Sequence, residues 1–322
     1  MFLITARALS WALARKPLVR QLRPVSSTPS TLLDAFDLVT NFRGHGWDWS
    51  RGVYIPRETR PSNRSRFIFH TILSAATHTF AFGILNTAIG TFSSASFGTL
   101  SGGGSIFDES LPSCLRYLRS SVISIFAFLW NYTAIQILYD LFTIVGVLIL
   151  GQELTRWPPS FDAPWRATSL TDFWGRRWHQ WFRHVFLTLG GYPLSFILGR
   201  PGIVIGAFLT SAVHHHIQLT ALNNDSEFWR MLIGFGMMGL GIIIEDIFKD
   251  VTGKEVHGLS GWVWTMGWNL LWGNVIIEGY TRAGLFRSLT FIDSVTPVRV
   301  LVEYLVTEFD SLLHAIPNVL VA

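Results

Sequence analysis

Charged residues are scarce in this sequence, and two long stretches lack them altogether. Asp, Glu, Lys and Arg make up 14% of the 322 residues, against about 25% in an average soluble domain. None occurs from Phe67 to Phe107 or from Pro201 to Asn224. A helix of roughly 20 mostly apolar residues can cross a bilayer core. Both stretches are long enough, so the scarcity of charge argues against an ordinary soluble domain and for a membrane protein.

Three further scarcities narrow the class of protein. The single cysteine, Cys114, excludes an internal disulfide. The net charge of +4 is too small and too dispersed for a nucleic-acid-binding surface, although it suits an anionic lipid surface or an anionic cosubstrate. Clustered histidines occur once, at 214–216. The lack of a second cluster argues against a di-iron membrane oxygenase and predicts no metal site, with a haem between His70 and His78 as a weaker alternative.

The apolar segments predict an all-α, polytopic membrane protein, a helical bundle with about six or more spanning helices. The segment 185–199 contains Gly190, Gly191 and Pro193, which predict a broken or re-entrant helix. The candidate spans are 67–92, 121–150, 185–199, 203–222, 231–249 and 259–281.

We expect three parts along the chain: a basic N-terminal segment (1–40), a membrane domain (41–290) and a tail (291–322) that alternates apolar and acidic residues and could form a surface helix. Eleven Lys and Arg precede Phe67 and five lie in 151–184, against two in 93–120. Cytosolic loops are enriched in Lys and Arg, so the first two regions should share the cytosolic side. The first 33 residues, basic and free of acidic side chains, fit either an amphipathic surface helix or a transit peptide.

The segment 169–183 combines aromatic and basic residues. Ser169 and Asp172 form a capping-box start for a helix. If the helix continues, Trp174, Trp178 and Trp181 fall on one stripe, and a second face carries Gly175, Arg176, His179 and Arg183. Arginine forks bind phosphate oxygens well. An interfacial helix with snorkelling arginines is the alternative interpretation.

The histidine cluster lies on a polar stripe of an otherwise apolar helix. Thr210, Ser211, His214, His215 and Gln218 share that stripe, whereas His216 points away. A neutral imidazole can take a proton from a hydroxyl near pH 7. Histidines hydrogen-bonded between helices, or a haem or metal site, are the alternatives, and spacing does not choose among them.

Glu245 follows another apolar run and has two interpretations. Its carboxylate could orient a histidine of the site, or it could pair with Lys249 one turn further along the helix. The second interpretation is slightly favoured on spacing.

These motifs resemble the wax synthase-like branch of the membrane-bound O-acyltransferases. The segment Ser169–His179 resembles the pattern S-x-x-[ED]-F-W-G-R-R-W-[NH] of that branch, and Ser211–His215 resembles S-G-[LV]-x-H, with Ala212 in place of glycine. Asn41–Trp49 is similar to the R-G-x-G-W segment of fungal members, many of which acetylate terpenoid or meroterpenoid alcohols. The resemblance covers about residues 40–290. Members of the branch tend to be longer and to begin with further membrane helices, whereas this chain begins with the basic segment.

The resemblance implies a catalytic histidine at His215 and a second site residue at His179. His215 would deprotonate an acceptor hydroxyl that attacks the thioester of an acyl-CoA, and His179 would position the thioester or stabilise its oxyanion. His214 adds a histidine beside the expected one, so the base could lie one residue away. Our candidates for contacts with the substrates are Arg176, Arg183, Trp178 and His214. The two arginines would bind the CoA phosphates.

The predicted function is therefore transfer of an acyl group, most simply acetyl, to a hydrophobic, terpenoid-like alcohol in secondary metabolism. Acyl-CoA would be a cosubstrate rather than a bound cofactor, the bilayer a second partner, and nucleic acid no partner. The family implies an integral, multi-pass protein of the endoplasmic reticulum. A transporter or a non-catalytic membrane protein with a histidine proton site remains the alternative.

Overall fold

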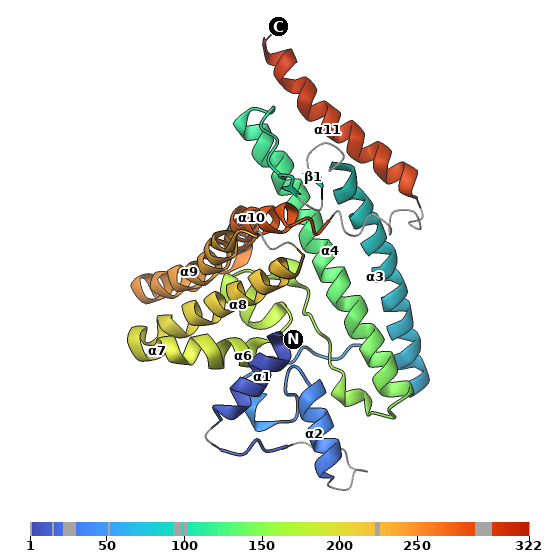
Figure 1. Ribbon diagram of the computed structural model, residues 1–322, viewed down its shortest axis with the longest axis vertical. Coiled ribbons are helices and arrows are strands. Elements are labelled where there is room, and N and C mark those ends of the chain that lie inside the picture. The colour runs from blue at the N-terminus through green and yellow to red at the C-terminus, as the bar shows by residue number, and fades with distance from the viewer. Residues whose placement is uncertain are drawn as a thin grey trace. The chain divides into compact units, whose positions relative to one another are not determined.

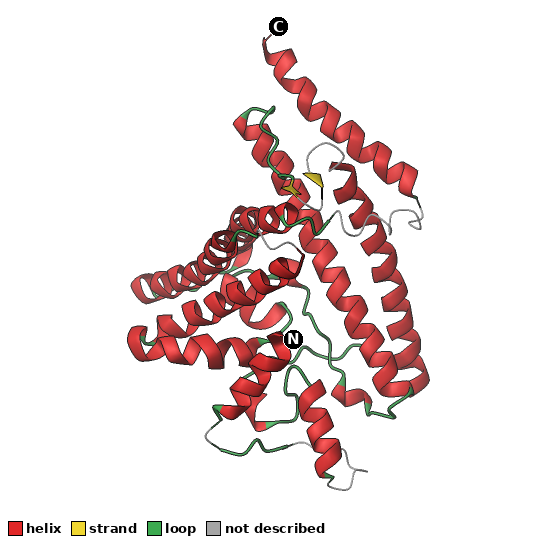
Figure 2. Cartoon of the chain, in the orientation of Figure 1, coloured by secondary structure: helices red, strands yellow, loops and turns green. Residues whose placement is uncertain are grey.

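The computed structural model describes residues 2–14, 16–21, 30–50, 52–92, 98–99, 102–222, 226–286 and 298–321. Helices dominate these residues (Figure 2), as the all-α prediction requires. The two strands, β1 (Gly98–Thr99) and β2 (Gly102–Gly103), form one short antiparallel pair. The expected boundary between residues 290 and 291 lies outside the described residues, and so does part of the loop 93–113.

Three helices are long and apolar enough to cross a membrane, counted over the described ranges. They are α3 (Arg64–Phe92), α4 (Ser113–Leu148) and α9 (Phe228–Thr252). They overlap the predicted spans 67–92, 121–150 and 231–249. Large apolar side chains of α3 and α4, such as Phe69 and Leu141, are exposed, as expected of helices that face lipid. Three helices therefore support a multi-pass arrangement, whereas the presence of six or more spans stays a prediction.

The segment 185–199 is a broken helix, which confirms the prediction from its glycines. It begins with α6 (Arg183–Phe186), widens into the π-helix η5 (Leu187–Gly191) and ends as α7 (Tyr192–Leu198). Gly199 then takes a φ of +63°, a conformation that favours glycine. The predicted spans 203–222 and 259–281 are also helical, in α8 (Arg200–Leu222) and α10 (Gly258–Arg282).

The chain forms two compact units and passes between them at residues 62–63, at residues 149–150 and within α8, α9 and α10. The first unit comprises residues 1–62, 150–214 and 235–266. Besides parts of those helices and the broken segment, it contains the following elements (Figure 1): α1 (Phe2–Ala12), α2 (Thr31–Thr40), η1 (Asp48–Ser50), η2 (Leu154–Arg156), η3 (Pro164–Arg166), α5 (Leu170–Asp172) and η4 (Phe173–Arg177).

The basic N-terminal segment is docked into the first unit through Arg7 on α1. This side chain is 7% exposed and donates to the carbonyl oxygens of Leu38 (2.7 Å) and Asn41 (2.8 Å). Its guanidinium also lies over the rings of Phe42 and Trp49, 5.3 and 5.5 Å from their centroids. Burial lowers the pKa of Arg7 to about 10. Carbonyl and cation–π contacts thus compensate a charge that has lost much of its hydration.

Glycines allow η5 and α8 to approach backbone to backbone within the first unit. A Cβ at Gly190 would overlap the Thr210 hydroxyl and the Gly206 carbonyl, and one at Gly206 would overlap the backbone of Gly190. A side chain at either position would push the two helices apart. This contact fixes the broken segment against the helix that carries the histidine cluster.

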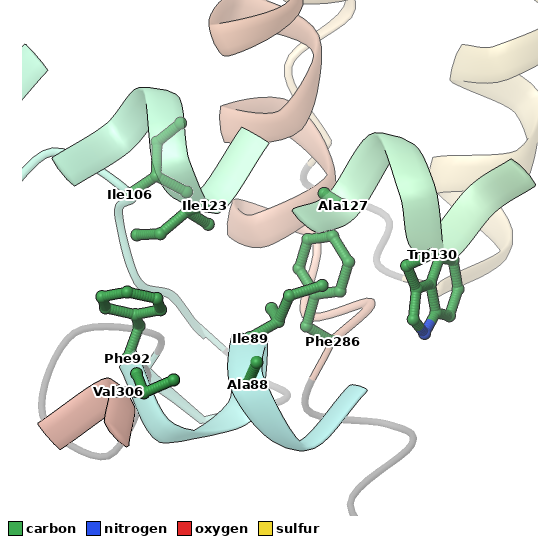
Figure 3. Packing of buried hydrophobic residues seen from close by; sticks show 9 residues of the cluster. All are labelled: Ala88, Ile89, Phe92, Ile106, Ile123, Ala127, Trp130, Phe286 and Val306. Carbon is green, nitrogen blue, oxygen red and sulfur yellow. The ribbon is translucent and has the colours of Figure 1, made fainter. Parts of the chain in front are cut away.

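The second unit comprises residues 63–149, 215–234 and 267–322. Its frame is α3 and α4, which lie side by side (Figure 1), with α11 (Arg299–Val321) packed on α3. Figure 3 shows its hydrophobic core, where side chains of α3, α4 and α11 meet those of two loops. The core residues are Ala88, Ile89, Phe92, Ile106, Ile123, Ala127, Trp130, Phe286 and Val306.

A buried arginine ties the tail helix to this core. Arg119 on α4 is 1% exposed and donates to the carboxylate of Asp310 on α11 at 2.6 Å. It also donates to the carbonyl oxygens of Phe92 (3.1 Å) and Ile106 (3.4 Å). The tail is therefore helical, as expected. It is anchored to the second unit through the pair of Arg119 and Asp310 and through Val306 in the hydrophobic core.

The close contact between η5 and α8 can be tested with alanine. Gly190→Ala should lower the stability of the detergent-solubilised protein by about 1–3 kcal/mol, because backbone must move to admit the methyl group. The measurement is the thermal unfolding midpoint. Gly236→Ala is the control, since no atom lies within 4 Å of its added Cβ, and alanine at such a helical position should add about 0.5–1 kcal/mol. Equal midpoints for the two variants would contradict the packing described.

Candidate functional site

The α-helix of the motif segment begins where predicted, at Ser169, and ends earlier than predicted. Ser169 caps α5, and its hydroxyl accepts a hydrogen bond from the backbone N–H of Asp172 at 2.9 Å. The helix then widens into η4, where Trp178 N–H donates to the Phe173 carbonyl at 2.8 Å. Trp178 itself is extended. The expected helix through Arg183 is therefore wrong, and with it the two helical faces, because a π-turn and an extended residue break the 100° period.

Stacked aromatic rings accompany this break. The ring of Trp178 stacks on that of Phe173, with centroids 5.9 Å apart and planes within 10°. It also meets Phe161 edge to face at 5.0 Å. Trp178 is 8% exposed and packs against aromatic neighbours of the first unit, and its contact with a substrate stays a prediction.

A buried carboxylate holds the start of the motif segment. Glu245 on α9 is 6% exposed and accepts hydrogen bonds from the backbone N–H groups of Leu170 (2.6 Å) and Thr171 (3.0 Å). The Thr171 hydroxyl (2.9 Å) and the indole N–H of Trp264 (2.9 Å) complete the set. The two backbone N–H groups lie at a helix N-terminus, where they have no partner within the helix and where a negative charge is favourable.

Both expectations for Glu245 are corrected by this geometry. The groups that donate to its carboxylate belong to the motif segment and to Trp264, and not to a histidine. Lys249 instead pairs with Glu255 at 2.6 Å. Spacing along one helix could not show this, because Leu170 lies 75 residues away in the sequence.

His179 lies directly after Trp178, inside a set of aromatic rings. Phe161, Trp178, Trp181 and Phe182 have ring centroids 5.4–6.0 Å from that of His179. Its Nδ1 is buried and has no hydrogen-bond partner among the described residues. Burial, reinforced by the positive charge of Arg43, lowers the pKa of His179 to about 3. The imidazole is therefore neutral at physiological pH, and its Nδ1 is a buried polar atom without a hydrogen bond among the described residues.

His214 shares an aromatic neighbour with His179. It is 3% exposed, and its ring centroid lies 5.3 Å from that of Phe182 and 5.8 Å from that of Phe186. Phe182 is thus in contact with the imidazoles of both His179 and His214. Spacing alone could not predict that His214, rather than His215, lies beside the ring that contacts His179.

His215 lies in the second unit and is held by polar groups. Its Nδ1 is 2.6 Å from the hydroxyl of Tyr280 on α10 and 3.2 Å from Oε1 of Gln218, one turn along α8. Gln218 belonged to the predicted polar stripe, whereas Tyr280 was missed. His179 and His215 belong to different units, so a cavity shared by them stays a prediction.

The two candidate arginines differ in their surroundings. The Arg176 side chain is 59% exposed and 4.0 Å from Asp172, and its guanidinium lies 4.6 Å from the ring centroid of Tyr54. The Tyr54 hydroxyl in turn donates to Asp162 at 2.8 Å. Arg183 is half-buried at the start of α6. Their proposed contact with CoA phosphates stays a prediction.

The glycine-rich segment before residue 50 also reaches the motif region. Arg43 donates to the carbonyl oxygens of Pro158 (2.5 Å) and Pro159 (2.6 Å), and it is 7% exposed. The R-G-x-G-W resemblance marked this arginine, but only the fold shows that it holds the chain that leads into the motif. Over the described residues, no group of three His, Cys, Asp or Glu side chains is arranged to hold a metal ion.

Fold and site together define a helical protein with apolar spans and a clamped, histidine-bearing motif segment. Residues 157–237 match the model of the membrane bound O-acyl transferase family. The match encloses both motifs, and with the relatives described next it confirms the resemblance seen in the sequence. This segment of the chain is therefore similar to the membrane bound O-acyl transferase family, as the motifs in the sequence indicated.

The relatives include fungal and plant transferases at low identity. The chain is 27% identical over 210 residues to O-Mevalon transferase yanI of Aspergillus niger, which covers 64% of this chain and 43% of that protein. It is 26% identical over 267 residues to acetyltransferase ple2 of Rhodocybe pseudopiperita, covering 77% and 67%. A long-chain-alcohol O-fatty-acyltransferase of Simmondsia chinensis is 28% identical over 144 residues, covering 42% and 40%. The chain thus spans less than half the length of the first of these relatives.

Removal of the Glu245 charge should loosen the motif segment. Glu245→Gln places an amide among four hydrogen-bond donors, and each bond to the charged group is worth about 1.5–3 kcal/mol. We expect the free energy of unfolding, measured by chemical denaturation in detergent, to fall by at least the value of one such hydrogen bond. Asp246→Asn is the matched control, because Asp246 is 3.8 Å from the exposed Arg200 and should cost less than about 0.5 kcal/mol. An unchanged Glu245→Gln protein would refute the clamp.

The environment of His179 predicts how stability depends on pH. The folded pKa of about 3 lies below the unfolded value of about 6.5. Between these values the unfolded chain binds a proton that the folded chain does not, so stability falls as pH falls from 6.5 towards 3 and is fully present above 6.5. His179→Phe should weaken this dependence, measured as the unfolding midpoint at pH 4.5 and pH 7. His257→Gln, at an exposed position, should leave it unchanged; equal pH dependence in wild type and His179→Phe would oppose the assignment.

Proposed function

We propose that the protein is a membrane-bound O-acyltransferase that moves an acyl group, most simply acetyl, from acyl-CoA to the hydroxyl of a hydrophobic, terpenoid-like alcohol. The observation that carries the proposal is the family match over residues 157–237, which contains both histidine motifs. Acetyltransferases and long-chain-alcohol acyltransferases among the relatives support the acyl donor and the alcohol acceptor. A place in secondary metabolism is part of this proposal, and the similarity to a fungal acetyltransferase supports it.

His215 is the proposed general base. It takes the proton of the alcohol while the alcohol oxygen attacks the thioester carbonyl carbon. The tetrahedral intermediate collapses as the C–S bond breaks, and the histidine returns the proton to the sulfur of CoA. The products are the ester and free CoA. The polar contacts of His215 support this role, since a base needs a defined ring orientation.

His179 is the proposed partner of the thioester oxygen. A neutral imidazole donates one N–H, and a donor fixed in a dry site stabilises a developing oxyanion strongly. The low pKa and the aromatic surroundings of His179 support this role. His214 and Trp178 would line the acyl or alcohol portion, and Arg176 and Arg183 would bind CoA phosphates from the cytosolic side.

The protein is proposed to act as an integral, multi-pass enzyme of the endoplasmic reticulum. The three long apolar helices and the family description support a position in the membrane. The bilayer would supply the hydrophobic alcohol laterally, whereas acyl-CoA would arrive from the cytosol, where the basic loop 151–184 is expected. Nucleic acid has no role in this proposal, and no cofactor is required.

Acyl transfer should depend on the three histidines to different degrees. In membranes that contain the full chain, we expect acetyl-CoA and a panel of terpenoid alcohols to yield esters. His215→Ala should lower the rate by about 10²–10⁴-fold through loss of the base, and His179→Ala by about 10²–10³-fold through loss of an oxyanion donor. Ester formation is measured by mass spectrometry. His214→Ala should reduce the rate less than His215→Ala.

The exposed His257 supplies the control, since His257→Ala should retain the wild-type rate. A rate that survives His215→Ala but falls in His214→Ala would move the base by one residue, to the imidazole next to Phe182. No CoA-dependent product with any alcohol or acyl-CoA would overturn the proposal in favour of a transporter or a non-catalytic protein.

A further inference from the structure

Two polar groups of the second unit, the Tyr280 hydroxyl and Oε1 of Gln218, meet at one nitrogen of His215. Nδ1 lies 2.6 Å from the Tyr280 hydroxyl and 3.2 Å from Oε1 of Gln218. The Tyr280 hydroxyl also donates to the same Oε1 at 3.5 Å. The ring of Tyr280 approaches the imidazole edge to face, with an interplanar angle of 82°. The triangle joins α8 to α10 across 65 residues of sequence.

The direction of these hydrogen bonds decides which nitrogen of His215 carries the proton. A carbonyl oxygen such as Oε1 of Gln218 only accepts. If Nδ1 were unprotonated, its lone pair would face the lone pairs of that oxygen at 3.2 Å, and the nitrogen and the oxygen would repel each other. With Nδ1 protonated, its N–H donates hydrogen bonds to the Tyr280 hydroxyl and to Oε1 of Gln218. The Tyr280 hydroxyl donates its own hydrogen bond to the same Oε1. This arrangement gives each of the three contacts one donor and one acceptor.

We propose that Tyr280 and Gln218 are positioning residues that hold His215 in its Nδ1–H form. In a neutral imidazole the other nitrogen, Nε2, then carries the lone pair and can accept a proton. This inference rests on the proposed function, because it assigns Nε2 as the atom that takes the hydroxyl proton. His214 instead contacts the aromatic rings of Phe182 and Phe186.

The same contacts would assist the reaction after the proton has moved. When Nε2 takes the proton of the alcohol, His215 becomes an imidazolium with both nitrogens protonated. The Nδ1–H bond to Tyr280 is then charge-assisted and stronger than in the neutral state. The gain is made only as charge develops, which is the condition for lowering a barrier. Return of the Nε2 proton to the departing CoA sulfur restores the starting form.

Nitrogen NMR can test the tautomer without any substrate. Full-length protein with ¹⁵N-labelled histidine is placed in nanodiscs above pH 7, and the His215 signals are identified by their loss in His215→Gln. We expect a protonated Nδ1 and an unprotonated Nε2 in the wild type. Tyr280→Phe combined with Gln218→Leu should shift the population to the Nε2–H form. A wild-type ring protonated at Nε2, or a double variant with unchanged signals, would overturn the inference.

Kinetics provide the second measurement. Tyr280→Phe and Gln218→Leu should each lower kcat by about 10–100-fold, as loss of a group that orients a functional histidine does, with KM for acyl-CoA and alcohol little changed. A merely structural contact would lower stability and leave kcat per folded molecule intact. Tyr139→Phe, which removes another buried tyrosine hydroxyl of the second unit, should keep the wild-type kcat.

The two proposals fail in different ways. An active wild type whose Tyr280→Phe and Gln218→Leu variants retain full kcat would end the positioning proposal and leave the transferase intact. A wild type inactive with every alcohol, yet with His215 in the Nδ1–H form, would end the transferase proposal and leave the orientation of His215 established by NMR.

Discussion

The carboxylate of Glu245 is the interaction on which the geometry of the motif segment depends. It lies in the interior of the first unit and accepts from two backbone N–H groups at the start of α5, a threonine hydroxyl and an indole. Burial of a carboxylate is unfavourable unless such donors replace its hydration. Because all four are supplied, the charge fixes α9, α10 and α5 to one another at the point from which η4 and His179 follow.

The histidines downstream of that clamp have contrasting environments. Aromatic rings surround His179, and one of them, Phe182, contacts His214 together with Phe186. A hydroxyl and a carbonyl oxygen orient His215. An apolar environment keeps an imidazole neutral, whereas oriented polar groups select one tautomer and stabilise a developing positive charge. Different environments for chemically identical side chains are a common way to separate an electrophilic role from a basic one.

Prediction from sequence succeeded where local patterns suffice. The uncharged and apolar stretches indicated α3, α4 and α9, the Gly190, Gly191 and Pro193 cluster indicated a broken helix, and Ser169 indicated a cap. Prediction failed after Phe173, where a π-turn replaced the expected α-helix because stacked rings and an extended Trp178 outweigh helix periodicity. Glu245 was misjudged for a related reason, since its partners are close in space and distant in sequence.

The sequence by itself determined that the chain is helical and apolar, and it identified the motif histidines, because burial in lipid and short spacing leave direct traces in composition. The tertiary structure decided which groups surround each histidine. Phe182 links His179 to His214, and Tyr280 reaches His215 from another helix. Such contacts depend on how helices pack, and packing is set by the whole set of side chains rather than by any one segment.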